Sequence, residues 1–434
     1  MQEVFARRRA RFYEGLKDGV ALLFSPPEAR YGHDVHYRYR PDPDLYYLTG
    51  LNEPEAAAVF DAARKRCVLF LRPRDRAKET WTGLRLGPRG AVRALGVEEA
   101  RPIGELHDRL PDLIRGHAVL HHAFGEHPEG DAIVSELLAR FRREARDPKR
   151  GPVVVADPTE VLHELRLSKD PEEVELMARS ASIAAAAHRE AMAFTKPERF
   201  EYELQALIER RFVHDGAAGW AYPTIVASGP NATILHYVEN RRRVERGDLV
   251  LVDAGCEYEG YASDITRTFP ATGKFSRLQR RFYSIVLIAQ KRAIAACRTG
   301  TPIEQVHETA RETLVQGLLE LGLLKGRPAE ILAKRRDARF VLHRTSHWLG
   351  LDVHDRGRYV EKDGGSRRLA PGMVLTVEPG LYVRPDEKNV APAFLGMGVR
   401  IEDDVLVTDA EPRVLTSEAP KEIDELEALV GKAS

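Results

Sequence analysis

Cysteine is scarce in this sequence. The 434 residues contain three cysteines, Cys67, Cys256 and Cys297. Their number is odd and their spacing is wide, which excludes a disulfide framework and a zinc knuckle built on thiolates. We therefore expect three free, buried thiols and a reducing compartment.

Long apolar runs and an excess of charge of one sign are also missing. No window reaches the length of a membrane span, and the first residues lack the apolar core of a signal peptide. Lysine plus arginine number 66, as do aspartate plus glutamate, so the formal net charge is zero. Binding along a nucleic-acid backbone needs a clear excess of positive charge on one surface. We expect a cytoplasmic protein that binds neither membranes nor nucleic acid.

The length of the chain predicts more than one domain, because a single hydrophobic core rarely grows this large. In the first part, strand-like runs at residues 19–25, 56–61 and 66–74 alternate with helix-like patterns, which is typical of an α/β domain. We predict an N-terminal α/β domain over residues 1–168 and a second domain over residues 169–434.

The second domain has a different pattern, in which helices come first and paired strands follow. Helices are expected at about 171–195, 199–215, 276–299 and 302–323, and strand-like segments at 340–355, 372–383 and 396–409. Helices that cover one face of an antiparallel sheet make an α+β fold, which we predict here.

Two aspartates stand inside the arms of a predicted hairpin. The stretch LVLVDAGCEYEGYASDITRTF, residues 249–269, has Asp253 and Asp264 where Val or Ile is expected. A loop centred on Tyr258-Glu259 makes the two acids directly opposed, with Cβ atoms roughly 5 Å apart. A divalent cation between them would relieve their repulsion. In the alternative, a slip of one residue turns one acid to the other face, and both are structural acids near a turn.

Three more polar residues lie in apolar strand contexts of the second domain: His347, Glu378 and Glu402. Each alone is more often a hydrogen-bonded core or turn residue, but buried acids are rare unless paired or bound to metal. Four carboxylates and one imidazole would bind two divalent cations. This ligand set favours Mn²⁺, with Co²⁺ or Zn²⁺ as alternatives. Two such ions can share a hydroxide and clamp a carbonyl oxygen, which is hydrolytic chemistry.

Several long motifs resemble one family. DAGCEYEGYASDITRTFP, SHWLGLDVHD, VLTVEPGLY and GVRIEDDVLVT are similar to the pita-bread metallopeptidases, and within them to the aminopeptidase P family. DLYYLTGLNEPEAA, RPRDRAKETW and LHELRLSKDPEE resemble that family's N-terminal domain and linker. The resemblance covers nearly the whole chain and implies an α/β N-terminal domain followed by a pita-bread catalytic domain.

The resemblance also implies roles for single residues. It makes five residues the ligands of a dinuclear metal centre, namely Asp253, His347 and Glu378, with Asp264 and Glu402 as bridging ligands. It implies catalytic roles for His236, His354, Glu378, Tyr382 and Arg400, and substrate contacts by His236, His343 and His354. Glu378 would carry a proton from the nucleophile to the leaving nitrogen. The sequence departs from the family at Arg344-Thr345, where the family has Gly-Leu, so substrate preference is less determined than the metal centre.

The activity implied by the resemblance is release of the N-terminal residue from peptides with proline in second position, by a hydroxide that bridges two metal ions. Prolidase, which cleaves Xaa-Pro dipeptides, shares the ligand set and is one alternative. A metal-free relative, either a creatinase-like amidinohydrolase or a binding module, is another, although such relatives lose ligands that are all present here.

The family's N-terminal domain builds a dimer or tetramer and lends a residue to a neighbouring active site. Trp81, in KETWTG, is the candidate for that substrate contact. Its alternative role is that of an aromatic residue partly buried in its own domain. We expect peptide substrates and a homo-oligomer.

Overall fold

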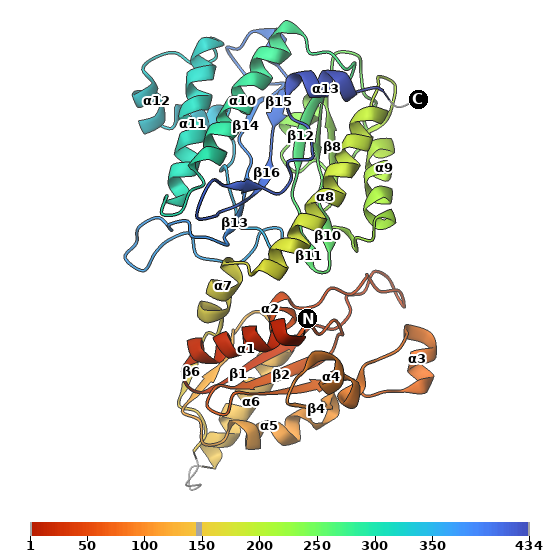
Figure 1. Cartoon of the computed structure of the whole chain (residues 1–434), viewed down its shortest axis with the longest axis vertical. Coiled ribbons are helices and arrows are strands. Elements are labelled where there is room, and N and C mark those ends of the chain that lie inside the picture. Colours follow the sequence, from red (N-terminus) through yellow and green to blue (C-terminus); the bar gives the residue numbers. More distant parts are fainter. Residues whose placement is uncertain (1, 145–149, 433–434) are drawn as a thin grey trace. The chain divides into compact units, whose positions relative to one another are not determined.

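The computed structural model of the chain describes residues 2–144 and 150–432. The chain divides into two compact units, Met1–Arg166 and Leu167–Ser434 (Figure 1). This division falls two residues before the boundary that we predicted from the sequence. Within the described residues, no helix combines the length and the apolar character that crossing a membrane requires.

The first unit is built on a six-stranded mixed sheet with strand order β4-β3-β2-β1-β5-β6. Its strands are β1 (Val20–Ser25), β2 (Ala56–Asp61), β3 (Arg66–Leu71), β4 (Glu99–Pro102), β5 (Val119–His121) and β6 (Val154–Ala156). Its helices are α1 (Gln2–Leu16), α2 (Pro43–Thr49), α3 (Arg76–Thr82), α4 (Gly87–Leu95), α5 (Leu106–Ile114), α6 (Pro128–Arg143) and α7 (Thr159–Leu167), the last of which ends at the division.

Helices cover both faces of this sheet. On one face, Leu110 of α5 and Leu137 of α6 pack against the strands in a common apolar core. On the other face, Phe12 of α1 meets Phe60 of β2 edge to face, with ring centroids 5.6 Å apart. All residues of β1 and β2 are buried, which explains why both strands read as continuous apolar runs. The α/β prediction for this unit is confirmed.

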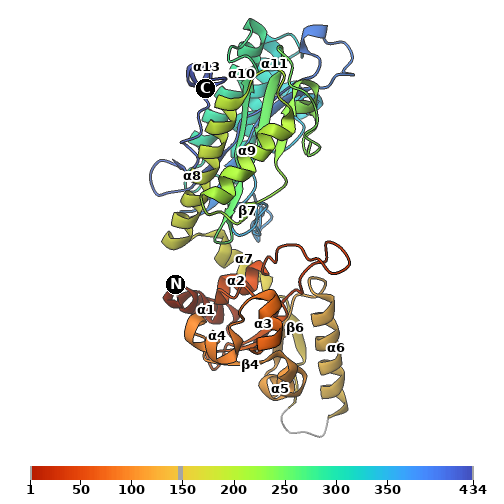
Figure 2. The same ribbon diagram turned by 90° about the vertical axis from the view of Figure 1, so that its right-hand side faces the viewer.

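The helices of the second unit are α8 (Pro171–Phe194), α9 (Glu201–His214), α10 (Arg277–Ala296), α11 (Ile303–Glu320), α12 (Pro328–Ala333) and α13 (Ile423–Leu429). Two long helices among them, α8 and α10, begin at capping boxes. Asp170 and Glu173 form a capping box at the start of α8, and Ser276 and Gln279 form one at the start of α10, which satisfies the first backbone N–H groups of each helix. Figure 2 shows α8 and α9 running side by side along the strands.

Short antiparallel strands make up the rest of the second unit, in the orders β11-β10-β7, β12-β9-β8, β13-β16-β17 and β14-β15. They are β7 (Gly219–Trp220), β8 (Ile225–Ser228), β9 (Leu249–Asp253), β10 (Cys256–Tyr258), β11 (Tyr261–Ala262), β12 (Thr266–Pro270), β13 (Val374–Val377), β14 (Gly380–Val383), β15 (Met397–Arg400), β16 (Asp403–Leu406) and β17 (Arg413–Val414). One large apolar core joins helices α8 to α11 to strands that include β8, β9, β12, β14 and β15, and a second core holds β13 and β16. This arrangement confirms the α+β prediction.

The register of the 249–269 hairpin differs from our prediction. The turn lies at Glu259-Gly260, both with positive φ (49° and 83°), as in a type I′ turn, which favours glycine. The centre is therefore one residue later than predicted, and Asp253 pairs with Thr266 rather than with Asp264. Asp264 stands two residues before Thr266, at a diagonal position, where side chains of opposing strands still share a face.

The segment 340–355, which we expected to contain a strand, forms none. It makes one isolated bridge, from Trp348 to Leu375, and otherwise runs as a loop beside β13. Gly350 lies close to Asp355 in this loop, since an added Cβ would be 2.1 Å from Asp355 Oδ2. The segment is nevertheless fixed, because Thr376 N–H donates to the His347 carbonyl at 2.9 Å.

Candidate metal centre

The predicted metal ligands lie at the ends of strands, where regular pairing stops. Asp253 is the last residue of β9, and Asp264 lies just before β12. Glu378 separates β13 from β14, and Glu402 separates β15 from β16. The apolar strand residues next to each of these acids are buried, so the core fixes the backbone on both sides. The carboxylate groups themselves face a common space.

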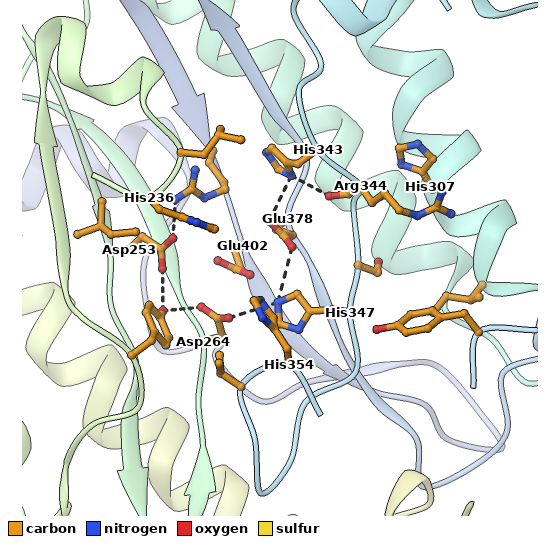
Figure 3. A pocket seen from close by; sticks show the side chains of 18 of the residues that line it. His236, Asp253, Asp264, His307, His343, Arg344, His347, His354, Glu378 and Glu402 are labelled. Carbon is orange, nitrogen blue, oxygen red and sulfur yellow. Dashed lines mark hydrogen bonds and ion pairs between the residues drawn. The ribbon is translucent and has the colours of Figure 1, made fainter. Parts of the chain in front are cut away.

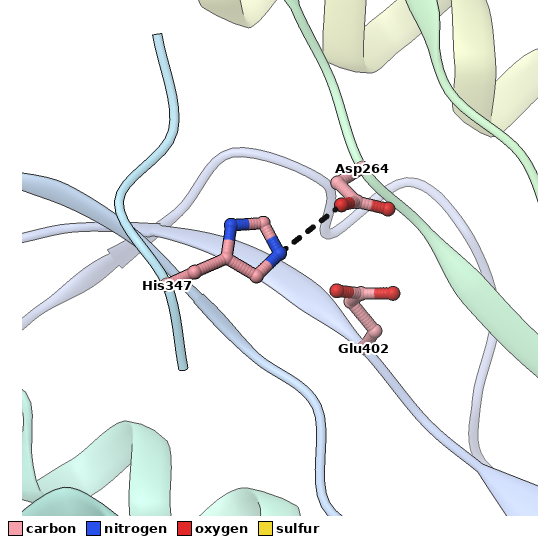
Figure 4. A group of neighbouring side chains, drawn as sticks. All are labelled: Asp264, His347 and Glu402. Atoms are coloured by element: carbon pink, nitrogen blue, oxygen red, sulfur yellow. Dashed lines mark ion pairs between the residues drawn. The ribbon is translucent and has the colours of Figure 1, made fainter. Parts of the chain in front are cut away.

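Three of the five ligands form a compact group (Figure 4). One ligand atom each from Asp264, His347 and Glu402 lies within 4.8 Å of the others. His347 Nε2 is 3.4 Å from Asp264 Oδ2 and 3.7 Å from Glu378 Oε1. Asp253 joins the group through a tyrosine, because Tyr222 OH lies 2.7 Å from Asp253 Oδ1 and 2.5 Å from Asp264 Oδ1.

Arg400 supplies the permanent positive charge at this site. Its guanidinium binds the Asp253 carboxylate and donates to Thr266 Oγ1 at 3.0 Å and to Tyr382 OH at 3.0 Å. Thr266 Oγ1 in turn donates to Glu402 Oε2 at 2.6 Å. Arg400 and Tyr382 therefore lie beside the acids.

The acids repel one another strongly. Burial raises the pKa of Glu402 well above its usual range, and the charges of Asp264 and Glu378 raise it further. Burial also raises the pKa of Glu378 to about 7, against the opposing effect of His347. Burial lowers the pKa of His347, but its hydrogen bond to Asp264 and the charge of Glu378 outweigh this and raise the pKa to about 9.

This donor set fits divalent cations. Four buried or partly buried carboxylates face two positive side chains, Arg400 and a protonated His347, so negative charge is in excess. Protons compensate part of that excess, as the raised carboxyl pKa values indicate. Two divalent cations would replace those protons, and oxygen-rich ligation with one imidazole suits Mn²⁺, Co²⁺ or Zn²⁺.

The acids form one wall of a cavity of about 1110 Å³ (Figure 3). His236, His343 and His354 also line it. Burial lowers the pKa of His343 to about 4. Burial, followed by the positive charge of His347, lowers the pKa of His354. Both rings are therefore neutral at pH 7, and a neutral imidazole can both donate and accept a hydrogen bond.

Two of these histidines have defined neighbours. The His354 ring meets the His347 ring edge to face, with centroids 4.5 Å apart. His343 Nε2 is 2.7 Å from Tyr382 OH, and its Nδ1 is 3.4 Å from Glu378 Oε2. All the site residues predicted in the second unit therefore meet at this cavity, with Tyr382 directly behind its lining.

Trp81 belongs to the other unit. It lies on α3, and its side chain is 88 % exposed, so it is not the partly buried aromatic residue of the alternative interpretation. Its predicted contact with a neighbouring active site stays a prediction.

Sequence reasoning missed two residues of the site. Tyr222 binds Asp253 and Asp264. Its sequence context does not predict this role, because it is an uncharged residue in a loop. Asp404 is buried, and its Oδ2 accepts the backbone N–H of Asp264 at 3.1 Å. Its position inside an apolar strand is the same signal that identified the other acids.

Comparison with known proteins agrees with this geometry. The model of metallopeptidase family M24 matches residues 175–409, and the model of the aminopeptidase P N-terminal domain matches residues 5–121. The chain is 44 % identical to Xaa-Pro aminopeptidase of Escherichia coli over 433 residues, covering 99 % of this chain and 98 % of that protein.

Solved structures agree as well. The structure of Pseudomonas aeruginosa aminopeptidase PepP matches with a TM-score of 0.96 and 42 % identity, over 99 % of this chain and 98 % of that one. A Zn-substituted E. coli aminopeptidase P in complex with product matches with a TM-score of 0.94 and 44 % identity, with the same coverage of both chains.

Proposed function

The chain belongs to metallopeptidase family M24, and we propose that it is a metal-dependent exopeptidase that releases the N-terminal residue from peptides with proline in second position. The observation that supports this proposal is the convergence of the five candidate ligand side chains, from separate strand ends and one loop, in the lining of one cavity. The full-length relatives named Xaa-Pro aminopeptidase support the choice of substrate.

Two divalent cations, with Mn²⁺ as the favoured ion, would be held by five side chains: Asp253, Asp264, His347, Glu378 and Glu402. When bound, such ions polarise a carbonyl oxygen and lower the pKa of water enough to provide a nucleophile at neutral pH. The excess of buried negative charge is what supports this occupancy.

The chain's own residues position the substrate and move the proton. Glu378 faces the cavity and would take a proton from the attacking water and pass it to the leaving nitrogen. His236 and His354 line the cavity as hydrogen-bonding groups for the substrate and for the developing oxyanion. Arg400 and Tyr382 hold Asp253 and His343 in place and so act as positioning residues.

Proline in second position is compatible with this cavity. Proline has no backbone N–H and a fixed φ, so a site that needs a donor from that residue rejects it. The lining includes apolar side chains such as Ile225, Leu235 and Val353 that suit a pyrrolidine ring. A prolidase would need a group that binds the carboxylate of the proline itself.

Hydrolysis of Arg-Pro-Pro and of Arg-Pro by metal-stripped protein, with and without Mn²⁺, tests the proposal. We expect Mn²⁺-dependent release of Arg from the tripeptide and little from the dipeptide. Cleavage of the dipeptide alone would make the protein a prolidase. Cleavage of neither, with metal bound, would overturn the proposed substrate.

We also propose a homo-oligomer, either a dimer or a tetramer, in a reducing cytoplasmic compartment. The exposed side chains of Trp81 and Leu84 (88 % and 83 % exposed) support an interface, because neighbouring exposed apolar groups mark contact surfaces. Three free, buried cysteines support the compartment.

A further inference from the structure

The segment from His343 to His347 runs along the wall of the cavity. His343, Arg344, Ser346 and His347 line the cavity, whereas Thr345 is buried, and its hydroxyl lies 2.9 Å from His307 Nδ1. Figure 3 shows the Arg344 side chain pointing away from the acids, toward His307. Arg344 therefore brings a positive charge to the part of the cavity that the metal centre does not use.

Arg344 is the arginine of the cavity lining that a ligand can reach. Among the described residues of that lining, the other arginine is Arg400, which is 4 % exposed and is held by Asp253 and Tyr382. The Arg344 side chain is 62 % exposed, and its ionic partner is Glu304 of α11, whose side chain is 45 % exposed. So exposed a pair contributes little free energy and can exchange partners readily.

Ser346, two residues after Arg344, has a hydroxyl without a partner among the residues that the structure describes. Ser346 borders the cavity, and its Oγ is buried. Buried hydroxyl groups are hydrogen-bonded as a rule. Rotation of the Ser346 side chain would bring its O–H to the cavity, where it could donate to a ligand.

Chain geometry puts Arg344 within range of a short peptide. Arg344 precedes His347 by three residues, so their Cα atoms are at most about 11 Å apart. When the first bond of a tripeptide lies at the metal centre, its terminal carboxylate lies two residues, or about 7 Å, beyond that bond. A long arginine side chain covers the remaining distance.

We propose that Arg344 binds a substrate carboxylate on the C-terminal side of proline, with Ser346 as a second donor and with Glu304 displaced from the guanidinium. The carboxylate comes either from the C-terminus of a tripeptide or from an acidic side chain in third position. An arginine can bind a carboxylate through two parallel hydrogen bonds. This inference rests on the proposed function, because it requires peptides to be cut at the metal centre.

The test compares kcat/KM within two peptide pairs, using the metal-loaded full chain. Arg-Pro-Pro is compared with Arg-Pro-Pro-NH2, which probes the C-terminus. Arg-Pro-Asp-NH2 is compared with Arg-Pro-Asn-NH2, which probes the side chain. We expect the wild-type protein to prefer the carboxylate in at least one pair by roughly two- to fivefold, the range of an exposed ion pair.

Variants assign that preference to Arg344. Arg344→Ala should bring the ratio to about one, and Arg344→Lys should keep part of it, because the charge remains without the planar fork. Glu304→Gln should raise the ratio, because it removes the competing carboxylate. Arg339→Ala is the matched control, since Arg339 pairs with Glu387 outside the cavity lining, and it should keep the wild-type ratio.

A nine-residue Arg-Pro peptide and its C-terminal amide serve as a length control for the comparison of kcat/KM. Their C-termini lie far beyond Arg344, so their kcat/KM values should agree. A preference that persists in Arg344→Ala, or no preference in either pair, would overturn the inference while leaving the aminopeptidase activity in place. No release of Arg from any of these peptides would instead overturn the proposed function.

Discussion

The hydroxyl of Tyr222 contacts two carboxylates that we propose as metal ligands, Asp253 and Asp264. Tyr222→Phe leaves these buried oxygens without that donor, which costs about 1–3 kcal/mol. We expect metal-free Tyr222→Phe to lose this much free energy of unfolding. Saturating Mn²⁺ should restore much of the difference, because the cations attract the same oxygens. Urea unfolding with and without Mn²⁺ measures both values, and an equal loss in the two states would contradict the assigned role.

We propose that the site residues divide into metal ligands and substrate-binding groups, and two variants separate these roles. His354→Ala should lower kcat/KM by about 10²–10³, as expected for a lost transition-state donor, yet keep most of its bound metal. Glu378→Ala should lose both activity and much of its metal. Metal analysis beside peptide hydrolysis checks this. A kcat/KM of His354→Ala within a few-fold of wild type would show that its role is wrongly assigned.

At the scale of single residues, charge inside an apolar strand was the useful signal, since such charge is costly unless it is paired. The signal identifies candidates but not their partners. Asp403 lies in the same strand context as Glu402, yet Arg267 Nη2 donates to it at 2.6 Å and Lys421 also binds it, so Asp403 is a structural ion-pair residue. Its arginine partner is 136 residues away in the sequence, and only the fold brings them together.

At the scale of elements, α8 supports the end of β9 through a histidine. His188 is 1 % exposed, and its Nε2 lies 3.0 Å from the carbonyl oxygen of Ala254, the residue after Asp253. Burial lowers the pKa of His188 to about 4. In the unfolded chain His188 titrates near its ordinary value of about 6.5.

This depressed pKa predicts how stability depends on pH. The unfolded state binds the proton more readily, so the free energy of unfolding is fully retained above pH 6.5 and falls as the pH approaches 4. The contribution of His188 to that fall is about 3 kcal/mol. His188→Gln does not titrate, so the difference in unfolding free energy between wild type and His188→Gln should shrink over this range. A difference that is constant from pH 7.5 to 4.5 would contradict the prediction.

The elements that the sequence predicted less well are those in which backbone geometry overrides the residue pattern. The positions of the hairpin arms were predictable from their apolar runs, but their register depends on Glu259, a non-glycine residue with positive φ. The segment 340–355 has a strand-like composition, yet it runs as a loop that makes one isolated bridge, from Trp348 to Leu375. Long helices such as α8 and α10 were predictable because capping boxes and periodic apolar residues agree there.

At the scale of the whole molecule, the length of the chain predicted more than one domain, and the structure has two compact units. The cysteine count predicted buried free thiols, and all three cysteines are free and buried. Neither the length of the chain nor the spacing of its motifs predicts how copies of the chain would associate. An interface depends on the shape of the folded surface, which the residue pattern does not reveal. Trp81 is the residue through which this question can be tested. With its side chain 88 % exposed in the first unit, it has little packing role of its own to lose.

Hybrid oligomers distinguish a contact within one chain from a contact between chains. Trp81→Ala and His354→Ala chains are each expected to have low activity. In a mixed dimer, the His354→Ala chain supplies Trp81 to the intact metal centre of the Trp81→Ala chain. Random association at equal amounts gives half mixed dimers with one complete site each, so about a quarter of wild-type activity should return. If Trp81 acts within its own chain, no mixed dimer has a complete site, and co-refolding should restore nothing above the sum of the two variants.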